Sequence, residues 1–309
     1  MITKAIIPAG GLGTRFLPAT KSLPKEMLPI FDKPAIQYIV EEGVKSGIKN
    51  YVVITGRNKS VIEDHFDVHP ELETFLRTRN KIDLLDGISK IVASSNFIYV
   101  RQKEPLGLGH AVWSAKHVIG NEPVAVFLPD DIIMSKVPAM AQIIQIALQE
   151  KCSVVAVQEV PLEDVSRYGI IGVRKQFSPN LFQVKELIEK PRMSEAPSNL
   201  AIVGRYVLSP KIFDALDQQQ LGVGGEIQLT DAIQELLISG EKVFALKIQG
   251  ERYDTGNPLG WLKANLDYAL RHPRYAEAVM EYLKTLDKDF IVMQGQAEAL
   301  SKPAKLLAM

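Results

Sequence analysis

Glycines cluster near the N-terminus, directly after a short apolar run. Residues 8–15 read Pro-Ala-Gly-Gly-Leu-Gly-Thr-Arg and follow residues 4–7, which we expect to form a strand. Because glycines let backbone N–H groups approach phosphate oxygens closely, this segment predicts a polyphosphate-binding loop. It fits neither common phosphate motif: Phe16 stands where a dinucleotide fingerprint needs its third glycine, and no Gly-Lys-Ser/Thr follows. A tight strand-to-loop turn would explain the same glycines.

Positively charged side chains accompany this loop. Arg15 ends it, and Lys21 and Lys25 follow in the next segment. A guanidinium can bind charged oxygens through two hydrogen bonds at once, and a lysine adds a compact point charge. These residues could neutralise a triphosphate, although a solvated loop would also carry them.

Acidic side chains follow a second apolar run. Asp130 and Asp131 come after residues 124–128, which we expect to be a buried strand, and ligands collect at the carboxyl ends of strands in open parallel sheets. Magnesium prefers oxygen ligands and takes one or two carboxylates, with water and phosphates completing its shell. Asp254, far along the chain, is the candidate partner of Asp130. Aspartates in turns or at helix caps remain the alternative.

A lysine stands at the end of a later strand pattern. Lys190 follows the strand-like residues 184–188 and precedes Pro191. The residue before a proline is biased toward an extended backbone, so we expect Lys190 to be extended and able to reach a sugar phosphate. Lysines are usually solvated, which is the competing interpretation.

Alternating strands and helices must position these groups. Apolar residues at helical spacing follow Pro34 and Pro138, and the alternation indicates βαβ units in a mainly parallel sheet. Beyond residue 165, the strand-like residues 182–188 and 201–208 are expected to extend the sheet and cover its open edge. Helices are expected near 210–219 and 228–238, and two more between 258 and 286 with a break at His272-Pro273. The clearest strand candidates are residues 5–7, 51–54, 97–100, 124–128 and 154–157.

Composition narrows the possible classes of protein. Lys+Arg and Asp+Glu both number 36, so no global field favours nucleic acid or a membrane surface, and neither is expected as a partner. No apolar run approaches the roughly 20 residues of a membrane helix. The single cysteine, Cys152, and the lack of a signal-peptide pattern predict a cytoplasmic protein. His65 and His69 have the spacing of a zinc pair, but no third ligand follows and Pro70 is expected to end their helix.

Taken together, the motifs resemble the signature of sugar-nucleotide pyrophosphorylases, in particular the bacterial ones that use UTP and glucose 1-phosphate. The resemblance implies one doubly wound α/β domain with a mainly parallel mixed sheet, Rossmann-like and glycosyltransferase-A-like, over residues 1–290. Its parts would be a nucleotide-binding half (1–160), a sugar-binding half (161–257) and C-terminal helices (258–290), followed by a tail (291–309). The shared segments are residues 10–15, 25–29, 101–111, 128–131, 189–191, 225–231 and 253–256.

The resemblance also implies roles for individual residues and an assembly, a homodimer or homotetramer. It assigns Mg²⁺ to Asp130 and Asp254, and catalytic contacts to Arg15, Lys25, Asp130 and Lys190. It assigns the nucleotide to Ala9, Gly10, Gly11, Gly13, Thr14, Glu26, Gln102, Gly107 and Gly109. It assigns the sugar to Asp131, Gly172, Glu189, Lys190 and Val203, with Gly172 in a loop that admits the sugar ring and Glu189 facing a hydroxyl.

The predicted reaction transfers a uridylyl group from UTP to glucose 1-phosphate, giving UDP-glucose and pyrophosphate, by in-line attack on the α-phosphorus. A phosphate monoester loses its second proton at about pH 6, so no general base is needed. A thymidylyltransferase making dTDP-glucose is one alternative, although Glu26 stands where those enzymes usually carry Gln. A non-catalytic regulator that binds sugar nucleotides is another, although such a protein could lose Asp130, Asp254, Arg15 and Lys190 without penalty.

Overall fold

The structure is a computed structural model, and it describes residues 1–285 of the chain. The predicted tail and the last residues of the predicted helical segment, 286–309, lie outside this range. None of the helices in the described range is long and apolar enough to cross a membrane.

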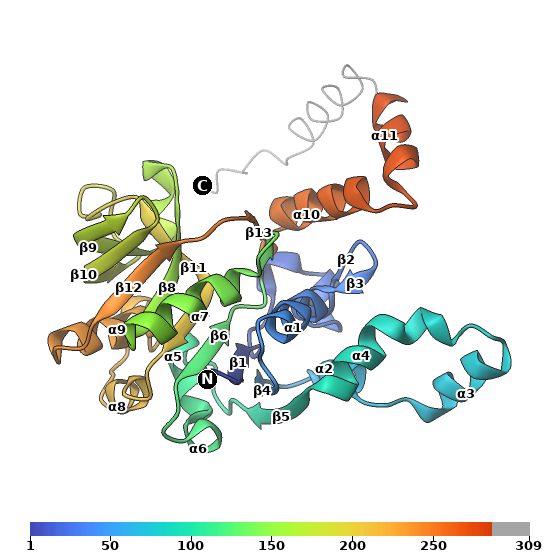
Figure 1. The fold of residues 1–309 in the computed structure, drawn as a ribbon, viewed down its shortest axis with the longest axis horizontal. Coiled ribbons are helices and arrows are strands. Elements are labelled where there is room, and N and C mark those ends of the chain that lie inside the picture. Colours follow the sequence, from blue (N-terminus) through green and yellow to red (C-terminus); the bar gives the residue numbers. More distant parts are fainter. Residues whose placement is uncertain (286–309) are drawn as a thin grey trace, which may run out of the picture.

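A nine-stranded mixed sheet forms the centre of the molecule, in the order β5-β4-β1-β6-β11-β8-β12-β10-β9 (Figure 1). The strands from β5 to β6 run parallel, as do β8 and β12, whereas β11 runs antiparallel to both β6 and β8. The strands are β1 (Lys4–Pro8), β4 (Asn50–Thr55), β5 (Asn96–Arg101), β6 (Val124–Phe127), β8 (Ser153–Glu159), β9 (Gly169–Ser178), β10 (Leu181–Glu189), β11 (Leu200–Leu208) and β12 (Val243–Lys247).

The later strands do more than extend this sheet. β10 and β9 lengthen it at one edge, as predicted, but β11 lies in its middle, between β6 and β8. The prediction that these strands extend the sheet and cover its open edge is therefore wrong for β11, which lies inside the sheet. A strand that is buried on both faces has a continuous apolar sequence at any position in the sheet. The sequence pattern therefore could not show where β11 lies in the strand order.

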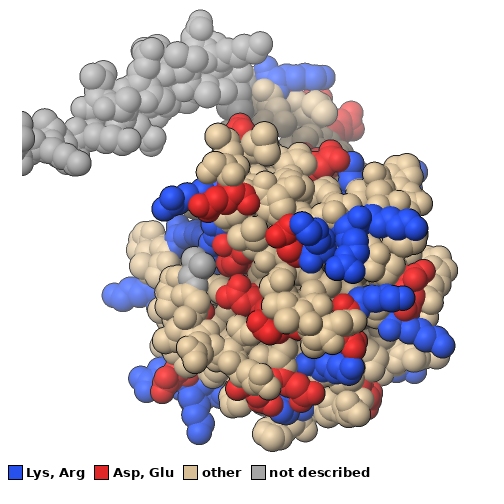
Figure 2. Space-filling model, turned by 90° about the vertical axis from the view of Figure 1, so that its left-hand side faces the viewer, with Lys and Arg blue, Asp and Glu red and all other residues tan. Residues whose placement is uncertain are grey.

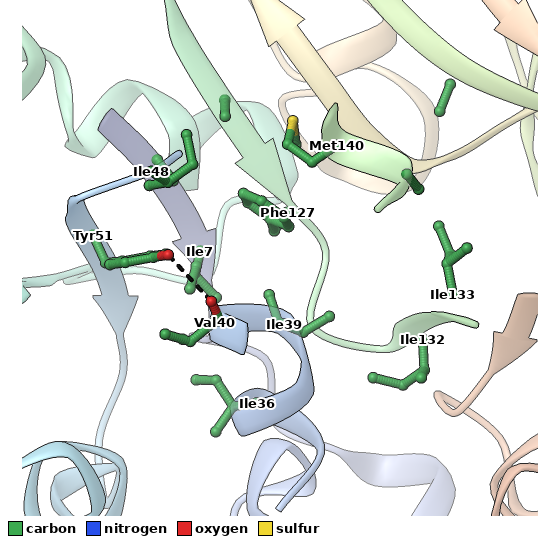
Figure 3. Packing of buried hydrophobic residues seen from close by; sticks show 14 of the residues in the cluster. Ile7, Ile36, Ile39, Val40, Ile48, Tyr51, Phe127, Ile132, Ile133 and Met140 are labelled. Atoms are coloured by element: carbon green, nitrogen blue, oxygen red, sulfur yellow. Dashed lines mark hydrogen bonds between the residues drawn. The ribbon is translucent and has the colours of Figure 1, made fainter. Parts of the chain in front are cut away.

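Both faces of the sheet are covered by helices, which confirms the doubly wound arrangement. Neighbouring residues of a strand point to opposite faces, so Ile7 packs into one core cluster and Ile6 into the other. Figure 3 shows Ile36 and Ile39 packing in the same cluster as Ile7. The first cluster involves α1 (Ala35–Lys45) and α7 (Ala139–Glu150), and the second α5 (Leu108–Ser114), α8 (Ile212–Asp217) and α9 (Leu229–Ile238).

Helices fill the connection between β4 and β5 and project from the body (Figure 1). They are α2 (Ser60–Phe66), α3 (Pro70–Thr78), η4 (Ile82–Leu85) and α4 (Asp86–Ser94). Pro70 begins α3 instead of ending a helix, because a proline is tolerated in the first helical turn. His65 and His69 therefore do not share a helix face, and the described residues hold no cluster of three metal-ligating side chains of the His, Cys, Asp and Glu types.

Two small strands and several short helices shape the edge of the sheet where the parallel strands end. β7 (Asp131–Met134) pairs antiparallel with β13 (Glu251–Asp254), outside the central sheet. α10 (Pro258–Arg271) and α11 (Ala276–Thr285) follow, which confirms the predicted break at His272-Pro273. The remaining elements are β2 (Pro29–Ile30), β3 (Lys33–Pro34), α6 (Lys116–Ile119), η1 (Thr14–Phe16), η2 (Ala19–Lys21), η3 (Lys25–Met27), η5 (Leu162–Arg167) and η6 (Val223–Gly225).

Candidate active site

A cavity of about 520 Å³ opens where the parallel strands β1 and β6 end. This is the position at which open α/β sheets bind ligands. A second cavity of about 410 Å³ lies between α1, β7 and α10, and none of the predicted site residues lines it. The predicted residues that line the first cavity are Gly10, Gly11, Thr14, Lys25, Glu26, Gln102, Gly107 and Asp130.

The glycine-rich loop forms one wall of this cavity. A side chain at Gly10 would place its Cβ 2.7 Å from Gln102 Oε1, so only glycine fits without displacing that amide. Gly13 has a φ of 66° and begins η1, and its carbonyl accepts a hydrogen bond from Thr20 Oγ1. Ala9 is buried, and its N–H donates a hydrogen bond to a backbone carbonyl of β4. Arg15 lies in η1 and is exposed. Among the described residues that line the cavity, Arg15 is absent.

The opposite wall is a turn closed by hydrogen bonds. Gln102 Nε2 donates to the carbonyl of Gly107 at 3.2 Å and lies 2.9 Å from His110 Nδ1. Gly107 has a φ of 99°, and Gly109 donates its N–H to the carbonyl of Ile227 at 2.8 Å. The turn is therefore fixed against the segment before α9, and its contacts orient the Gln102 amide.

Glu26 carries a buried ion pair in the floor of the cavity. Its Oε2 lies 2.7 Å from Lys59 Nζ, and the two residues are only 2% and 7% exposed. Within the described residues, its other oxygen, Oε1, has no hydrogen-bond partner. Lys59 was not predicted, because it lies in an ordinary polar turn before α2 and nothing in its sequence surroundings marks it.

Asp130 forms an ion pair with Lys25, another of the predicted residues. The Asp130 Oδ2 to Lys25 Nζ distance is 2.6 Å. Burial acts to raise the pKa of Asp130, but the charge and hydrogen bond of Lys25 outweigh it and lower that pKa. Burial acts to lower the pKa of Lys25, but the charges of Asp130 and Glu26 and the hydrogen bond to Asp130 together outweigh it, so the pKa of Lys25 is raised. Both groups therefore stay charged at neutral pH.

Asp254 converges on Asp130 across the pairing of β7 with β13. A Cβ built on Gly256 would lie 3.0 Å from Asp130 Oδ2 and 3.0 Å from Asp254 Oδ1. Thr255 donates both its N–H and its Oγ1 hydroxyl to the carbonyl of Asp130, at 2.8 and 2.9 Å. The structure thus brings the two predicted metal ligands to one point, and Gly256 leaves the space between them open. Arg167 Nη2 lies 3.5 Å from Asp254 Oδ2.

Asp131 points away from Asp130, as expected for neighbours in an extended segment. Its Oδ2 accepts the N–H of Gly204 at 2.9 Å, and its Oδ1 pairs with Arg252 at 2.5 Å. Arg205, fully buried, donates to the Asp131 carbonyl and pairs with Glu42 at 2.7 Å. Burial raises the pKa of Asp131, and the negative charge of Asp130 adds to that.

These arginines were missed by the sequence reasoning. Arg252 stands two positions before Asp254 on β13, and strand alternation places such residues on one face, so this signal could have found it. Arg205 lies in the apolar strand β11 and has no comparable signal.

Of the predicted sugar-binding residues, Gly172, Glu189 and Val203 lie on β9, β10 and β11, Lys190 follows the end of β10, and Asp131 begins β7. Glu189 ends β10 opposite Gly169 of β9, and its Oε2 accepts a hydrogen bond from Thr230 Oγ1 at 2.7 Å. Lys190 Nζ lies 3.5 Å from the other oxygen, Oε1. Burial raises the pKa of Tyr206, and the negative charges of Glu189 and Asp131 raise it further.

Details predicted for this side differ in the structure. Lys190 has a φ of 47°, in the left-handed region and not extended, in a bend directly after β10 where its N–H donates to the carbonyl of Tyr168, just before β9. Gly172 lies within strand β9, not in a loop, and a Cβ there would come 2.7 Å from Glu186 Cγ. Val203 is fully buried in the core, so only its backbone could face a ligand. For Lys190 and Gly172, the pairing of β9 with β10 decides the backbone conformation.

Comparison with known proteins gives consistent matches over nearly the whole chain. The family described as nucleotidyl transferase matches residues 4–271. The UTP–glucose-1-phosphate uridylyltransferase of Staphylococcus epidermidis is 52% identical over 286 residues, which cover 93% of this chain and 99% of that protein. The UTP–glucose-1-phosphate uridylyltransferase 1 of Staphylococcus saprophyticus is 50% identical over 287 residues, covering 93% and 99%.

Solved structures agree with this result. A UDP-glucose pyrophosphorylase complexed with UDP-glucose is 41% identical, with a TM-score of 0.81, and covers 88% of this chain and 100% of that chain. A UTP-bound UGPase from Acinetobacter baumannii is 42% identical, with a TM-score of 0.85, and covers 93% and 100%.

Proposed function

This chain belongs to the nucleotidyl transferase family, and we infer that it is the enzyme that transfers the uridylyl group of UTP to glucose 1-phosphate, giving UDP-glucose and pyrophosphate. The observation that carries this inference is the cavity at the carboxyl ends of β1 and β6, where the glycine-rich loop and Gln102 face Lys25 and Asp130. Relatives that match nearly end to end bear this activity in their names.

The nucleotide would bind between the glycine-rich loop and the turn that contains Gly107 and Gly109. Gln102, whose amide is already oriented by Gly107 and His110, would offer hydrogen bonds to the edge of the uracil. Backbone N–H groups of Gly10, Gly11, Gly13 and Thr14 would face the phosphates, as in other anion-binding nests. Ala9, Glu26, Gly107 and Gly109 would shape this pocket.

The residues at Gly256 fit a divalent cation, which we propose is Mg²⁺. Asp130 and Asp254 would hold it, since their carboxylate oxygens converge on the space that Gly256 leaves open. The Lys25 ammonium already lies against Asp130, which indicates that this point attracts positive charge. When bound, the ion would neutralise phosphate charge and help align the reacting groups.

The side chains of this protein would then do little covalent chemistry. Lys190 would hold the phosphate of the incoming sugar, and Glu189 and Asp131 would face its sugar side. Arg15 and Lys25 would stabilise the departing pyrophosphate from the opposite side. The sugar phosphate is already anionic at neutral pH, so catalysis consists of positioning and charge neutralisation.

We propose that the nucleotide-binding half (1–160) and the sugar-binding half (161–257) form one domain. Supporting this, β11 of the second half lies between β6 and β8 of the first, so neither half has a complete sheet of its own. The helices that begin at Pro258 complete the described part.

Assembly and location are also proposals. A homodimer or homotetramer is supported by the apolar side chains of Leu259, Leu262 and Leu266, which are 60%, 48% and 37% exposed along one face of α10. Light scattering of the purified protein would measure its mass. A cytoplasmic location is supported by the free, partly buried thiol of Cys152, which suits a reducing compartment.

Pyrophosphate release tests the proposed function. Four nucleoside triphosphates, including dTTP, are each combined with glucose, galactose and mannose 1-phosphates, with and without Mg²⁺. We expect release with UTP and glucose 1-phosphate, only with the metal. Equal or faster release with dTTP would instead identify a thymidylyltransferase, and tight binding of UDP-glucose without release in any mixture would identify a regulator.

A further inference from the structure

Glu189 is held by one neutral donor that comes from a distant part of the chain. Thr230, the second residue of α9, donates its Oγ1 hydroxyl to Glu189 Oε2 at 2.7 Å. Thr230 is 6% exposed, and the Glu189 side chain is 11% exposed. A hydrogen bond to a buried charged group is among the stronger polar contacts in proteins.

The two carboxylate oxygens of Glu189 have different surroundings. Oε2 is occupied by Thr230, whereas Oε1 faces Lys190, whose Nζ is 3.5 Å away on a side chain that is 42% exposed. At that distance the lysine makes no tight hydrogen bond, so Oε1 keeps capacity to accept a hydroxyl proton. The oxygen that remains available therefore lies beside the lysine expected to hold the sugar phosphate.

Gly169 packs tightly against this contact. It pairs with Glu189 across β9 and β10, and a Cβ at Gly169 would lie 2.8 Å from Thr230 Oγ1 and 3.1 Å from Glu189 Oε2. The hydroxyl and the carboxylate thus fill the space above a glycine, which limits how far the carboxylate can turn.

Without the Thr230 hydroxyl, Glu189 has an alternative partner. Asp231, the next residue of α9, is also acidic and offers no positive charge to Oε2. Lys190 is the adjacent cation, and its exposed side chain can move. Loss of the hydroxyl would favour a closer Glu189–Lys190 ion pair than the present one at 3.5 Å, which would withdraw both groups from a bound sugar phosphate.

We propose that Thr230 is a positioning residue that holds Glu189 ready for a sugar hydroxyl and limits how closely it pairs with Lys190. Through Glu189 it sets both the affinity for the sugar 1-phosphate and the discrimination between hexose epimers. This role rests on the function proposed above and adds to it a residue that acts only through its contact with Glu189.

Two substitutions at Thr230 and a matched control test this role. Thr230→Val removes the hydroxyl at nearly constant volume, and Thr230→Ser keeps it. Gln234→Leu is the control, because Gln234 Oε1 accepts the N–H of Leu187 at 2.8 Å and so joins the same helix to the same strand without touching Glu189.

Steady-state kinetics separates positioning from loosened packing. We expect Thr230→Val to raise KM for glucose 1-phosphate about tenfold or more, since a hydrogen bond to a charged group is lost, and to leave KM for UTP nearly unchanged. Its preference for glucose over galactose 1-phosphate should fall, and Thr230→Ser should restore both values. Gln234→Leu should lower Tm but leave KM for glucose 1-phosphate near that of the wild type.

Thr230→Val is also combined with Glu189→Gln. If Thr230 acts through Glu189, the double variant should show the same KM as Glu189→Gln alone. Additive effects, an unchanged KM in Thr230→Val, an equal rise of both KM values, or the same change in Gln234→Leu would each overturn the proposal.

Calorimetry keeps this test separate from the function itself. The affinity of each variant for UDP-glucose is divided by its affinity for UDP, and the quotient reports the sugar contact whether or not the protein turns over. We expect the quotient to fall in Thr230→Val and to recover in Thr230→Ser. Wild-type protein that binds UDP and UDP-glucose equally would overturn the proposal, whereas absent turnover with an intact quotient would contradict only the proposed function.

Discussion

Two regions of the site are formed by different chemical groups. The nucleotide wall consists of the glycine-rich loop and the turn from Gln102 to Gly109, and the sugar wall consists of Asp131, Glu189 and Lys190 with their partners. Around the nucleotide cavity, glycines and backbone groups do most of the shaping, with Gly10 and Gly107 packed so closely that a side chain would not fit. On the sugar side, ionised side chains are held by partners far along the chain, as Glu189 is by Thr230 and Asp131 by Arg252. A backbone wall is set by a local motif, whereas a side-chain wall depends on long-range contacts.

Figure 2 adds the surface to this comparison. Lysine and arginine side chains are interspersed with aspartate and glutamate over the face that it shows, in keeping with equal totals of each sign in the chain. Anionic substrates would therefore be held by the local groups of the two walls and not by a field of the whole protein.

The largest effect is expected where the two walls meet, at Asp130. Asp130→Asn should lower kcat by two to three decades, because a single well-placed electrostatic contact stabilises a transition state by about 3 kcal/mol. Pyrophosphate release measures it. Asp217→Asn is the control, since Asp217 also pairs with a lysine, Lys116, but outside the site. Near-normal turnover in Asp130→Asn would show that Asp130 is not at the centre of the reaction.

On the sugar wall, Arg252→Gln should lower stability strongly. It leaves Asp131, only 5% exposed, without its charged partner, and breaking a buried ion pair typically costs about 3 kcal/mol or more. Urea unfolding measures the change. Arg271→Gln breaks the exposed pair with Glu251 and should change stability by less than about 1 kcal/mol. Equal effects of the two substitutions would mean that the sugar wall does not depend on its buried pair.

On the nucleotide wall, Gly10→Ala should act on binding more than on folding. Its Cβ would meet Gln102 Oε1 at 2.7 Å, so the amide must move away from its present position. We expect KM for UTP to rise about tenfold, the equivalent of one lost hydrogen bond, with KM for glucose 1-phosphate little changed. Gly87→Ala on α4, where a Cβ meets nothing closer than 3.8 Å, is the control. If both KM values rose together, the two walls would not be independent.

The smallest effect concerns the pH dependence of the Lys25–Asp130 pair. The pKa of Asp130 is lowered, so its contribution to stability is present above the pKa of a free aspartate, about 3.9, and is lost as the pH falls through the folded value. The pKa of Lys25 is raised, so its contribution is present below about 10.4 and is lost as the pH rises through the folded value.

Lys25→Met tests this pH dependence. The wild type should be more stable than the variant by about 1 kcal/mol near pH 7, because the pair is partly exposed, and the difference should shrink below about pH 4. Urea unfolding between pH 3 and 9 measures both proteins. Lys116→Met, which breaks the surface pair with Asp217, should differ little from the wild type at any pH. A Lys25→Met difference that is constant with pH would contradict the pKa shifts.

Much of the fold could be predicted because strong local patterns carried it. Continuous apolar runs indicated strands covered on both faces, and helices do cover both faces of the sheet. The position of β11 between β6 and β8 could not be predicted, because strand order depends on which edges meet in three dimensions. The resemblance implied a loop at Gly172, where pairing with β10 forms a strand.

The site divides in the same way. The glycine-rich loop and Gln102 line one cavity, as their motifs indicated, because each motif encodes its own turn. Lys190 is not extended as its neighbour Pro191 predicted; it lies in a bend at the end of β10 and donates its N–H to Tyr168, which is distant in sequence. Lys59 and Arg205 could not be predicted, because each acts through a partner distant in sequence, whereas Arg252 was missed although its spacing from Asp254 could have indicated it.

The sequence by itself determined the chemical groups of this protein and the short segments that present them: a glycine-rich loop, an aspartate after each of two apolar segments and a lysine at a strand end. Only the tertiary structure decided that Asp130 and Asp254 converge on Gly256, and that Thr230 reaches Glu189. The physical reason is the separation in sequence of the interacting residues. Backbone conformation follows from neighbouring residues, whereas the distance between two charges depends on how the whole sheet is assembled.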